Sequence, residues 1–581
     1  MIGTIVAAVV VATAPFHLDI YTKNVLIRAF FLAALAMTVD VLWGYTGILT
    51  FGQSAFFGIG AYACALVAMH FGFGPFWFAG AFLVALLASV AVAWLIGWLA
   101  FYHGASPLYG SIVTLALPIV FVQLIFAGGR FTGSSSGISS FPTYYWSFET
   151  WFWIAGGYLI AVTALGYLLV KSDFGRILVA IRENEERCAY LGLPVSRIKI
   201  VLMMAAGAIG AGGGFGYAAF TNVVAPELGG FLLGTELLIF TALGGRGTLI
   251  GPVVGTIGID VTASYLSGSL PFLWKLITGV AFVAVIVLLP QGLIPIIGQG
   301  LRRLWPVRHR ESVDDVTLRS FEPTAPHGET SSAPLRTEGL QRHYGSLKVL
   351  DGIAIESRAS ELLSIVGPNG AGKTTLMRCV SDGGERSGGQ VFVNGTEIGR
   401  GAPQSVVALG IGRSFQNTNL FETLTVADCL LLARWRIDGA SLFSRRSEIA
   451  LPRPAVGILQ ATGLDKALAT QTRNLSHGQK RGLELAMVLA SEPSVLLLDE
   501  PTAGLTKAER TAIGDVLTAL AREHGLSILL IEHDLDFVRD ISDRIVVLHQ
   551  GALLMEGTVD EVIASTLVKA VYSGQSVETA P

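Results

Sequence analysis

Residues 1 to about 298 consist mainly of long apolar stretches separated by short polar segments, and no other feature limits the possible folds as strongly. Five stretches approach the roughly 20 residues that a helix needs to cross the hydrocarbon of a bilayer. They cover 76–100, 108–126, 151–170, 200–220 and 273–297. Buried strands usually span only about 4–8 residues. These stretches therefore predict membrane-spanning helices.

Five weaker apolar stretches cover 1–16, 25–47, 54–71, 231–248 and 251–267. We expect the first of them to be a spanning or interfacial helix and not a cleaved signal, because no basic residues open it. Together the stretches predict a polytopic α-helical membrane domain over 1–299, with about eight to ten helices. The glycine-rich segment 210–214 and Pro118 interrupt two of them, which membrane helices tolerate where neighbours cover the freed backbone.

Basic residues predict the orientation of these helices. They cluster in 171–199 and again in 302–310, whereas 127–150 contains only Arg130. By the positive-inside rule the two basic segments are cytoplasmic and 127–150 faces the other side. We therefore expect a multi-pass protein of the bacterial cytoplasmic (inner) membrane with its N-terminus inside. Glu236 and Asp260 lie in apolar stretches, and such acids are either functional or packed against a satisfied partner.

The chain changes character near residue 300. Residues 300–334 contain many Pro, Ser and Thr residues and predict a cytoplasmic linker. From 335 to 575, short β-type runs alternate with amphipathic helical stretches, which predicts an α/β domain. Residues 576–581 are left as a C-terminal tail. The 581-residue chain has a net charge of −3, so nothing attracts it overall to nucleic acid.

A phosphate-binding loop follows the apolar run 361–366. Gly367 and Gly372 enclose four residues and precede Lys373 and Thr374, which completes the pattern Gly-x4-Gly-Lys-Thr between a strand and a helix. Lys373 is expected to reach the β- and γ-phosphates, and the Thr374 hydroxyl to bind Mg²⁺. ATP and Mg²⁺ are therefore the predicted cofactors. The candidate nucleotide-binding residues here are Gly367, Asn369, Gly370, Gly372, Lys373, Thr374 and Thr375.

Two carboxylates end a second apolar run, 494–498. A buried strand here would deliver Asp499 to the metal. Glu500 would then stand where a general base polarises the attacking water. An acidic pair after a strand can also be a solvated turn, but its position after a phosphate loop favours the catalytic interpretation. The domain is thus predicted to be an α/β phosphate-loop ATPase.

Residues 475–479, Leu-Ser-His-Gly-Gln, resemble the signature of ATP-binding cassette (ABC) proteins, usually Leu-Ser-Gly-Gly-Gln. Three other positions resemble family motifs in the expected order. Tyr344 resembles the aromatic residue that stacks on adenine, and His533 the switch histidine. Gln416 resembles the Q-loop residue that senses the γ-phosphate, contacts the permease and binds the metal. The resemblance implies catalytic roles for Glu500, His533 and Gln416.

The same resemblance implies that two ATPase domains dimerise head to tail. Ser476, Gly478 and Gln479 would then complete the site on the partner's nucleotide. Two positions depart from the commonest family pattern: His477 replaces the first signature glycine, and Thr506 stands where many members have an aspartate. A bulky residue at 477 also resembles the amino-acid-importing branch of the family. Thr506 puts the coupling between the two sites in question.

Residues 180–194 resemble the coupling helix of bacterial importers, in which a Glu precedes a Gly by six residues, here Glu186 and Gly192. An ordinary solvated loop helix is the alternative. This segment, and 243–248 with Gly251 and Pro252, resemble the LivM-type permease of branched-chain amino-acid importers. The ATPase part, including residues 572–574, resembles the LivG-type subunit.

This resemblance implies ATP-driven import of a small solute. It also implies an external solute-binding protein, a second permease chain and a second ABC ATPase chain, with lipid around the helices. Members of the family carry branched-chain amino acids, urea, short amides or aromatic acids, so the solute stays open. An exporter of hydrophobic compounds is disfavoured by the coupling motif. A membrane-anchored, non-transporting ATPase is disfavoured by the number of spans.

Overall fold

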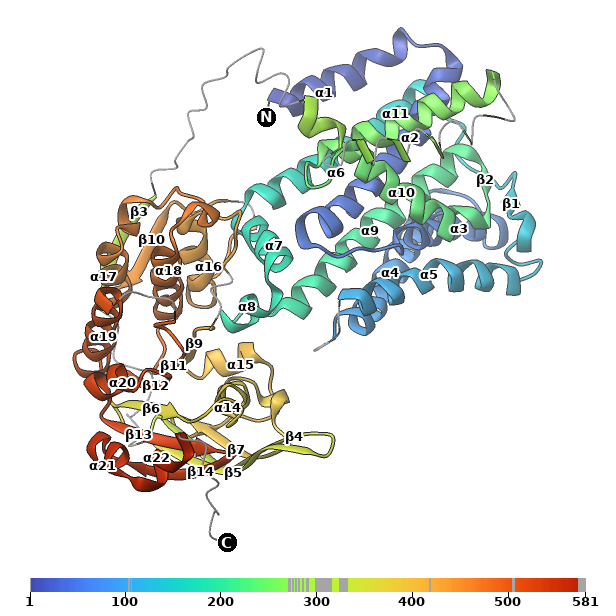
Figure 1. The fold of residues 1–581 in the computed structure, drawn as a ribbon. Coiled ribbons are helices and arrows are strands. Elements are labelled where there is room, and N and C mark those ends of the chain that lie inside the picture. Colours follow the sequence, from blue (N-terminus) through green and yellow to red (C-terminus); the bar gives the residue numbers. More distant parts are fainter. Residues whose placement is uncertain are drawn as a thin grey trace. The chain divides into compact units, whose positions relative to one another are not determined.

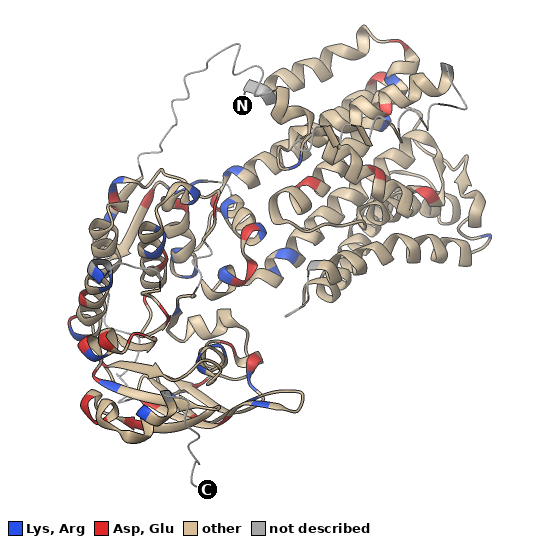
Figure 2. Ribbon diagram, viewed as in Figure 1, with Lys and Arg blue, Asp and Glu red and all other residues tan. Residues whose placement is uncertain are grey.

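The computed structural model describes 2–102, 105, 107–269, 316–322, 333–416, 420–442, 444–503 and 507–572, with scattered residues between 273 and 297. It contains two compact units, shown in Figure 1. The helical unit comprises Met1–Arg182, Val195–His309 and Leu442–Ser444, and the α/β unit comprises Glu183–Pro194, Arg310–Ser441 and Arg445–Pro581. Charged side chains are sparse on the helices of the helical unit and frequent in the α/β unit (Figure 2).

The helical unit has helices where the apolar stretches predict them. Their bounds are α1 Ile2–Thr13, α2 Ile20–Asp40, α3 Gln53–His70, α4 Pro75–Phe101, α5 Pro107–Ala127, α6 Phe148–Lys171, α7 Asp173–Glu183, α9 Val195–Thr221, α10 Phe231–Gly244 and α11 Ile250–Ser269. A small antiparallel pair, β1 Ile138–Ser139 and β2 Val223–Val224, joins two of the loops. The predicted helix over 273–297 falls on residues of which only some are described.

Among the described residues, six helices are long and apolar enough to cross a membrane. They are α2 with the π-helical turn after it, α3, α4, α5, α6 and α9. Helices α1 and α10 have 12 and 14 residues. At about 1.5 Å per residue, these two reach only about 18–21 Å, less than the roughly 30 Å of hydrocarbon. The described residues therefore support six spans, fewer than the eight to ten predicted.

The glycine run at 210–214 does not interrupt its helix, and α5 likewise continues through Pro118. A Cβ atom on Gly214 would lie 1.9 Å from the carbonyl oxygen of Phe57, and one on Gly60 would lie 2.0 Å from that of Ala211. These glycines form the surface on which α3 and α9 cross. Helices α9 and α5 thus tolerate these residues, as expected, and the small residues allow the backbones of α3 and α9 to approach closely.

Polar contacts fix both ends of α2. At its C-terminal end the buried Asp40 accepts hydrogen bonds from the backbone N–H groups of Gly247, at 2.6 Å, and Leu249, at 3.0 Å. Arg182 binds the Gly44 carbonyl on the same side, at 2.7 Å. Near the N-terminal end, Lys23 pairs with Glu149 of α6 at 2.5 Å. Since 171–199 is the predicted cytoplasmic segment, we expect the Asp40 end of α2 to face the cytoplasm.

The α/β unit is built on two main sheets, with β3 and β10 forming a separate two-stranded parallel sheet. The larger has the order β14-β13-β6-β12-β11-β9, with β14 antiparallel and the other five strands parallel. The smaller is antiparallel, with the order β5-β4-β7-β8. The strands are β3 Thr317–Phe321, β4 Leu335–Tyr344, β5 Leu347–Ser357, β6 Leu362–Val366, β7 Gly388–Val393, β8 Thr396–Glu397, β9 Ile411–Arg413, β10 Glu448–Pro452, β11 Val495–Asp499, β12 Ser527–Ile531, β13 Arg544–His549 and β14 Ala552–Gly557.

Helices pack on these sheets, and β6, β11 and β12 are buried along their whole length, as apolar runs in a covered parallel sheet must be. The helices are α8 Glu185–Tyr190, α14 Lys373–Ser381, α15 Pro403–Ala408, α16 Val426–Asp438, α17 Arg453–Ala461, α18 His477–Ala490, α19 Lys507–Arg522, α20 Leu535–Ile541, α21 Val559–Ala564 and α22 Thr566–Tyr572. The α/β fold predicted for 335–575 is confirmed.

Part of the predicted linker is ordered. Strand β3 lies inside 300–334, yet it pairs in parallel with β10 along five residues. Ion pairs flank the strand, Arg319 with Glu448 at 2.8 Å and Arg453 with Glu322 at 2.7 Å. The linker prediction was wrong for these residues because backbone pairing to a distant strand leaves no local periodicity. The predicted tail 576–581 lies outside the described residues.

Replacing Gly60 by Ala tests the close crossing of α3 and α9. The new methyl group must displace the Ala211 backbone, and overpacking of this kind costs about 1–3 kcal/mol. We expect the melting temperature of the purified protein in detergent to fall. Gly157→Ala on α6 is the matched control, because a Cβ there meets nothing within 4 Å. Equal melting temperatures for the two variants would contradict the assigned crossing.

Candidate nucleotide site and its connection to α8

The phosphate loop connects β6 to α14, as the sequence predicts. Three of its glycines have positive φ values: 154° at Gly367, 82° at Gly370 and 98° at Gly372. A Cβ at Gly367 would lie 2.3 Å from the Leu548 carbonyl oxygen, so a side chain is excluded there by space as well as by conformation. The loop therefore needs glycine, and its last glycine caps the N-terminus of α14.

A cavity of about 380 Å³ opens over this loop. Its walls are Val349, Asn369, Gly370, Ala371, Gly372, Lys373, Thr374, Thr375, Gln416, Glu500 and His533. Apart from Val349, which lies in β5 of the smaller sheet, these groups follow β6, β9, β11 and β12 of the parallel part of the larger sheet. Ligands of α/β sheets bind outside the carboxyl ends of parallel strands. The sheet therefore brings together residues that are far apart in the chain.

Lys373 is folded back onto its own loop. Its ammonium donates to the carbonyl oxygens of Gly367, at 2.7 Å, and Pro368, at 3.0 Å. Burial lowers the pKa of Lys373, although the nearby carboxylates of Glu500 and Asp499 oppose that shift. A polyphosphate in the cavity would offer stronger, charge-assisted acceptors than these carbonyls. Lys373 is therefore placed to exchange carbonyl contacts for phosphate contacts.

Asp499 ends β11 and is 3% exposed. Its Oδ1 has no hydrogen-bond partner among the described residues, although the Thr374 hydroxyl bonds to the same carboxylate. Burial raises the pKa of Asp499, and the neighbouring Glu500 adds to the shift. A buried, unpaired carboxylate oxygen beside a threonine hydroxyl fits a hard cation that takes its other ligands from phosphate and water. These two residues would hold Mg²⁺.

Glu500 stands in the centre of the cavity wall with a φ of 49°, a left-handed conformation that is strained for a glutamate. One of its carboxylate oxygens lies 2.5 Å from His533 Nε2, and the other accepts a hydrogen bond from Gln416 Nε2 at 2.7 Å. The buried Glu532 fixes this corner by accepting from both the N–H and the hydroxyl of Thr502. Glu500 thus contacts both of the other predicted catalytic side chains, Gln416 and His533.

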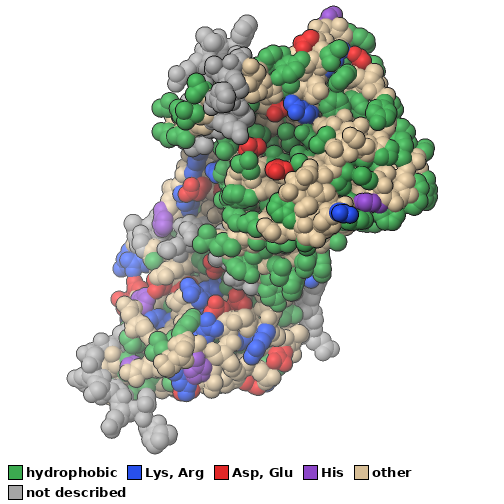
Figure 3. Space-filling view, turned by 90° about the vertical axis from the view of Figure 1, so that its right-hand side faces the viewer, with side chains coloured by type: hydrophobic (Ala, Val, Ile, Leu, Met, Phe, Trp, Pro, Cys, Tyr) green, Lys and Arg blue, Asp and Glu red, His purple; other side chains and the backbone are tan. Residues whose placement is uncertain are grey.

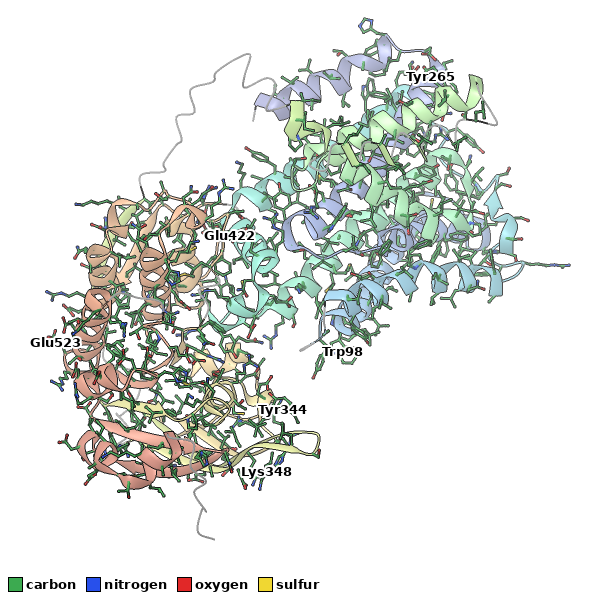
Figure 4. The ribbon with its side chains drawn as sticks, viewed as in Figure 1. Trp98, Tyr265, Tyr344, Lys348, Glu422 and Glu523 are labelled. Atoms are coloured by element: carbon green, nitrogen blue, oxygen red, sulfur yellow. The ribbon has the colours of Figure 1, made fainter. Side chains whose placement is uncertain are left out.

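Other predicted site residues lie outside this cavity. Tyr344 is at the end of β4, 46% exposed, with the Arg342 guanidinium 4.3 Å from its ring centroid (Figure 4). Ser476 caps α18 through reciprocal hydrogen bonds with Gln479, and Gly478 lies within the first turn. Ser476 and His477 are exposed. Thr506 and residues 573–574 lie outside the described residues.

A buried charge network behind the cavity was not predicted. Arg481 of α18 donates to the carbonyl oxygens of Phe415, at 2.6 Å, Glu500, at 3.1 Å, and Pro501, at 3.3 Å. Its partner Glu484, fully buried, accepts from Arg481 at 2.9 Å and from the Phe415 N–H at 2.9 Å. One ion pair therefore sets the backbone on both sides of the Gln416–Glu500 contact.

Segment 183–194, which contains α8, belongs to the same compact unit and reaches this network. Arg187 is 3% exposed and pairs with Glu484 at 3.2 Å. Tyr190 packs edge-on against the Phe415 ring at 5.1 Å and accepts a hydrogen bond from Arg413 at 3.1 Å. Since Phe415 precedes Gln416, α8 contacts the residue next to the predicted γ-phosphate sensor.

The sequence singled out Glu186 in this segment, but the structure leaves Glu186 exposed and buries its neighbour Arg187. The signal that could have found Arg187, Arg481 and Glu484 is weak. Arg481 and Glu484 are three apart on a helix, a spacing also common on solvated surfaces. Nothing local distinguishes such a pair from a buried one, so only tertiary structure identifies it.

Two families match the chain. Residues 21–286 match the family described as "Branched-chain amino acid transport system / permease component", and residues 350–503 match the ABC transporter family. LivG of Salmonella typhimurium, a high-affinity branched-chain amino acid transport ATP-binding protein, is 35% identical over 252 residues, 42% of this chain and 98% of LivG. BraF of Pseudomonas aeruginosa, with the same description, is 36% identical over 251 residues, again 42% and 98%.

Solved ATP-binding cassettes also resemble the α/β unit. The ADP conformation of the cassette MJ1267 is 28% identical, with a TM-score of 0.37 over 42% of this chain and 100% of that one. A nucleotide-free cassette from an ABC transporter is 25% identical, with a TM-score of 0.36 over 41% and 98%.

The fold and the cavity define an ABC-type ATPase joined to a membrane permease. The chain belongs to the branched-chain amino acid family of ABC transporters, with the permease and ATP-binding components in one polypeptide. It is a membrane protein whose ATPase lies in the cytoplasm, it binds nucleotide, and its ATP hydrolysis is coupled to transport.

Asp499→Asn tests the metal site. Because the pKa of Asp499 is raised in the folded state, its ionised form costs stability at neutral pH, and a neutral amide removes that cost. Without nucleotide we expect the melting temperature to rise by about 2–4 °C, the effect of about 1 kcal/mol in a domain of this size. Stabilisation by Mg²⁺-ATP should disappear. Asp515→Asn, exposed on α19, is the control. A lower melting temperature for Asp499→Asn would contradict this assignment.

Arg187→Gln tests the contact of α8 with the ATPase network. Glu484 keeps Arg481 and the Phe415 N–H, so the catalytic corner should stay folded and hydrolyse ATP. Solute transport per ATP hydrolysed should fall by roughly tenfold, within the usual range of coupling energies. Both rates are measured in proteoliposomes with the complete transporter. Glu186→Gln, exposed in the same segment, should behave as wild type. Equal loss of hydrolysis and transport in Arg187→Gln would contradict a coupling role.

Proposed function

We propose that this chain is the fused permease and ATPase subunit of a binding-protein-dependent importer that moves branched-chain amino acids across the bacterial cytoplasmic (inner) membrane. The observation that carries the proposal is the burial of Arg187 and Tyr190 against the Gln416 loop. A segment that lies in sequence between two membrane helices thereby joins the ATPase at its phosphate-sensing residue. The names of the LivG and BraF relatives support the solute.

In this proposal ATP enters the cavity over the phosphate loop, and Lys373 leaves its backbone carbonyls for the β- and γ-phosphates. Thr374, Asp499 and Gln416 would hold Mg²⁺, which would supply charge neutralisation at the phosphates. Glu500 orients the attacking water, and His533 holds the carboxylate in position. Gln416 would have to give up its hydrogen bond to Glu500 to serve as a metal ligand, and this movement would displace Phe415 against Tyr190. The displacement is the signal that α8 carries to the membrane helices.

The exposed signature residues support a head-to-tail pair of ATPase domains. Ser476, Gly478 and Gln479 stand outside this chain's own phosphate cavity, at the N-terminus of α18, where partial positive charge favours an anion. They would bind the nucleotide held by a second ATPase chain, and Tyr344 would stack on adenine. A second permease chain and an external solute-binding protein complete the transporter. His477 and Thr506 depart from the commonest family pattern, and we propose that they alter the coupling between the two ATP sites.

Import of urea, short amides or aromatic acids on the same scaffold is the second candidate. No side chain of the described membrane helices favours these solutes over branched-chain amino acids. Export of hydrophobic compounds is disfavoured by the likeness of residues 21–286 to the importer permease family.

The test is ATP-dependent uptake of labelled leucine by cells that express this chain with its binding protein and partner subunits. Uptake that isoleucine and valine displace, and that Glu500→Gln abolishes, is the expected result. Glu500→Gln removes the base while keeping the size of the side chain. A complex that hydrolyses ATP but takes up no leucine would overturn the proposed solute, and urea, amides and aromatic acids would then be tested in the same cells.

A further inference from the structure

Three polar residues meet within the apolar helices of the permease, away from the nucleotide site. They are Arg28 on α2, Tyr217 on α9 and Asp260 on α11. The Arg28 side chain hydrogen-bonds the Tyr217 hydroxyl and lies close enough to attract the Asp260 carboxylate. All three side chains are partly exposed. Figure 3 shows how few charged side chains interrupt the hydrophobic surface on one face of this unit.

The charges of Arg28 and Asp260 attract each other, but each side chain keeps an atom that has no hydrogen-bond partner. Nε of Arg28 and Oδ2 of Asp260 are buried atoms that have no hydrogen-bond partner within the described part of the permease. No direct ion pair joins the two side chains there. The Lys23–Glu149 pair, by contrast, is closed at 2.5 Å. Charged side chains with unsatisfied atoms inside a membrane are costly and are retained where function requires them.

The cluster lies on the external side of the bundle. Tyr21, at the start of α2, donates to the Ser264 carbonyl at 2.9 Å and packs against the Tyr265 ring at 5.3 Å. Figure 4 labels Tyr265 on α11. Arg28 is two turns beyond Tyr21, and Asp260 is about one turn before Ser264, so both lie roughly 6–11 Å below that end. The opposite end of α2 is the cytoplasmic one, where Arg182 binds.

The geometry points to a ligand that carries a negative and a positive charge a few atoms apart. A guanidinium fork binds a carboxylate, and the Tyr217 hydroxyl can donate to the same group. The Asp260 carboxylate accepts from an ammonium. The Phe57 ring packs edge-on against Tyr217 at 5.5 Å and adds apolar surface beside the charges. We propose that Arg28, Tyr217 and Asp260 form a permease site for the zwitterionic head of an α-amino acid.

This inference rests on the proposed function and makes it more specific. Urea carries neither charge, and an aromatic acid lacks the ammonium that Asp260 would bind. A site of this kind therefore selects amino acids over the other solutes after the binding protein has released its ligand. Since the cluster lies in the outer half of the membrane, it would act on the outward-open form.

The experiment uses the complete transporter in proteoliposomes and measures labelled leucine uptake, ATP hydrolysis and subunit assembly. Arg28→Gln and Asp260→Asn should each reduce uptake by roughly tenfold or more, as loss of one partner of a buried charged contact does. The double variant Arg28→Met with Asp260→Leu removes both charges and leaves no unpaired one. It should assemble and hydrolyse ATP but transport no leucine. Glu149→Gln, from the closed ion pair, should keep wild-type uptake.

Leucine uptake at the wild-type rate by the double variant would overturn the inference and make the pair structural, since buried ion pairs can often be replaced by apolar residues without loss of fold. That result would leave the proposed function intact. A wild-type transporter that carries no leucine would overturn the proposed function itself, and this inference with it. If the single variants fail to assemble, the double variant still decides.

Discussion

The ion pair between Arg481 and Glu484 is the interaction on which the ATPase geometry depends. A buried pair is a poor source of net stability, because desolvation opposes the attraction. The pair instead fixes the orientation of its neighbours. Arg481 holds the backbone of residues 499–501 and 415, and Glu484 holds the Phe415 N–H and Arg187. A shift in any one of these segments must be felt by the others. A transporter needs such a linkage between segments if phosphate binding is to move a membrane helix.

The helical unit obeys a different constraint, the absence of water around its backbone. Helices there approach through glycine, as at Gly60 and Gly214, and polar residues are few and mostly used in closed contacts. Asp40, fully buried, is satisfied by two backbone N–H groups of the loop before α11. The Arg28–Asp260 pair departs from that rule. Residues that depart from the pattern of their surroundings are expected at functional sites.

The sequence predicted the elements that depend on a local pattern of residues. Nine apolar stretches became helices within a few residues of their expected bounds, and the strand–loop–helix around Lys373 has its predicted form. The contacts among Gln416, Glu500 and His533 follow from strand order, which spacing alone does not give. The sequence missed β3, whose partner β10 lies more than a hundred residues away, and it missed Arg187, which looks like any charge of a loop helix. The predicted count of eight to ten spans stays a prediction, because the helix predicted over 273–297 is only partly described, while six spans are found among the described residues.

The central claim is that the buried contact of α8 with the Gln416 loop makes hydrolysis and transport one process. The most direct measurement follows both rates in the same proteoliposomes as loaded binding protein is added outside. The account predicts that ATP hydrolysis and leucine accumulation rise together and keep a constant ratio over the titration. Hydrolysis that ignores the binding protein, or that rises while no leucine enters, would contradict it.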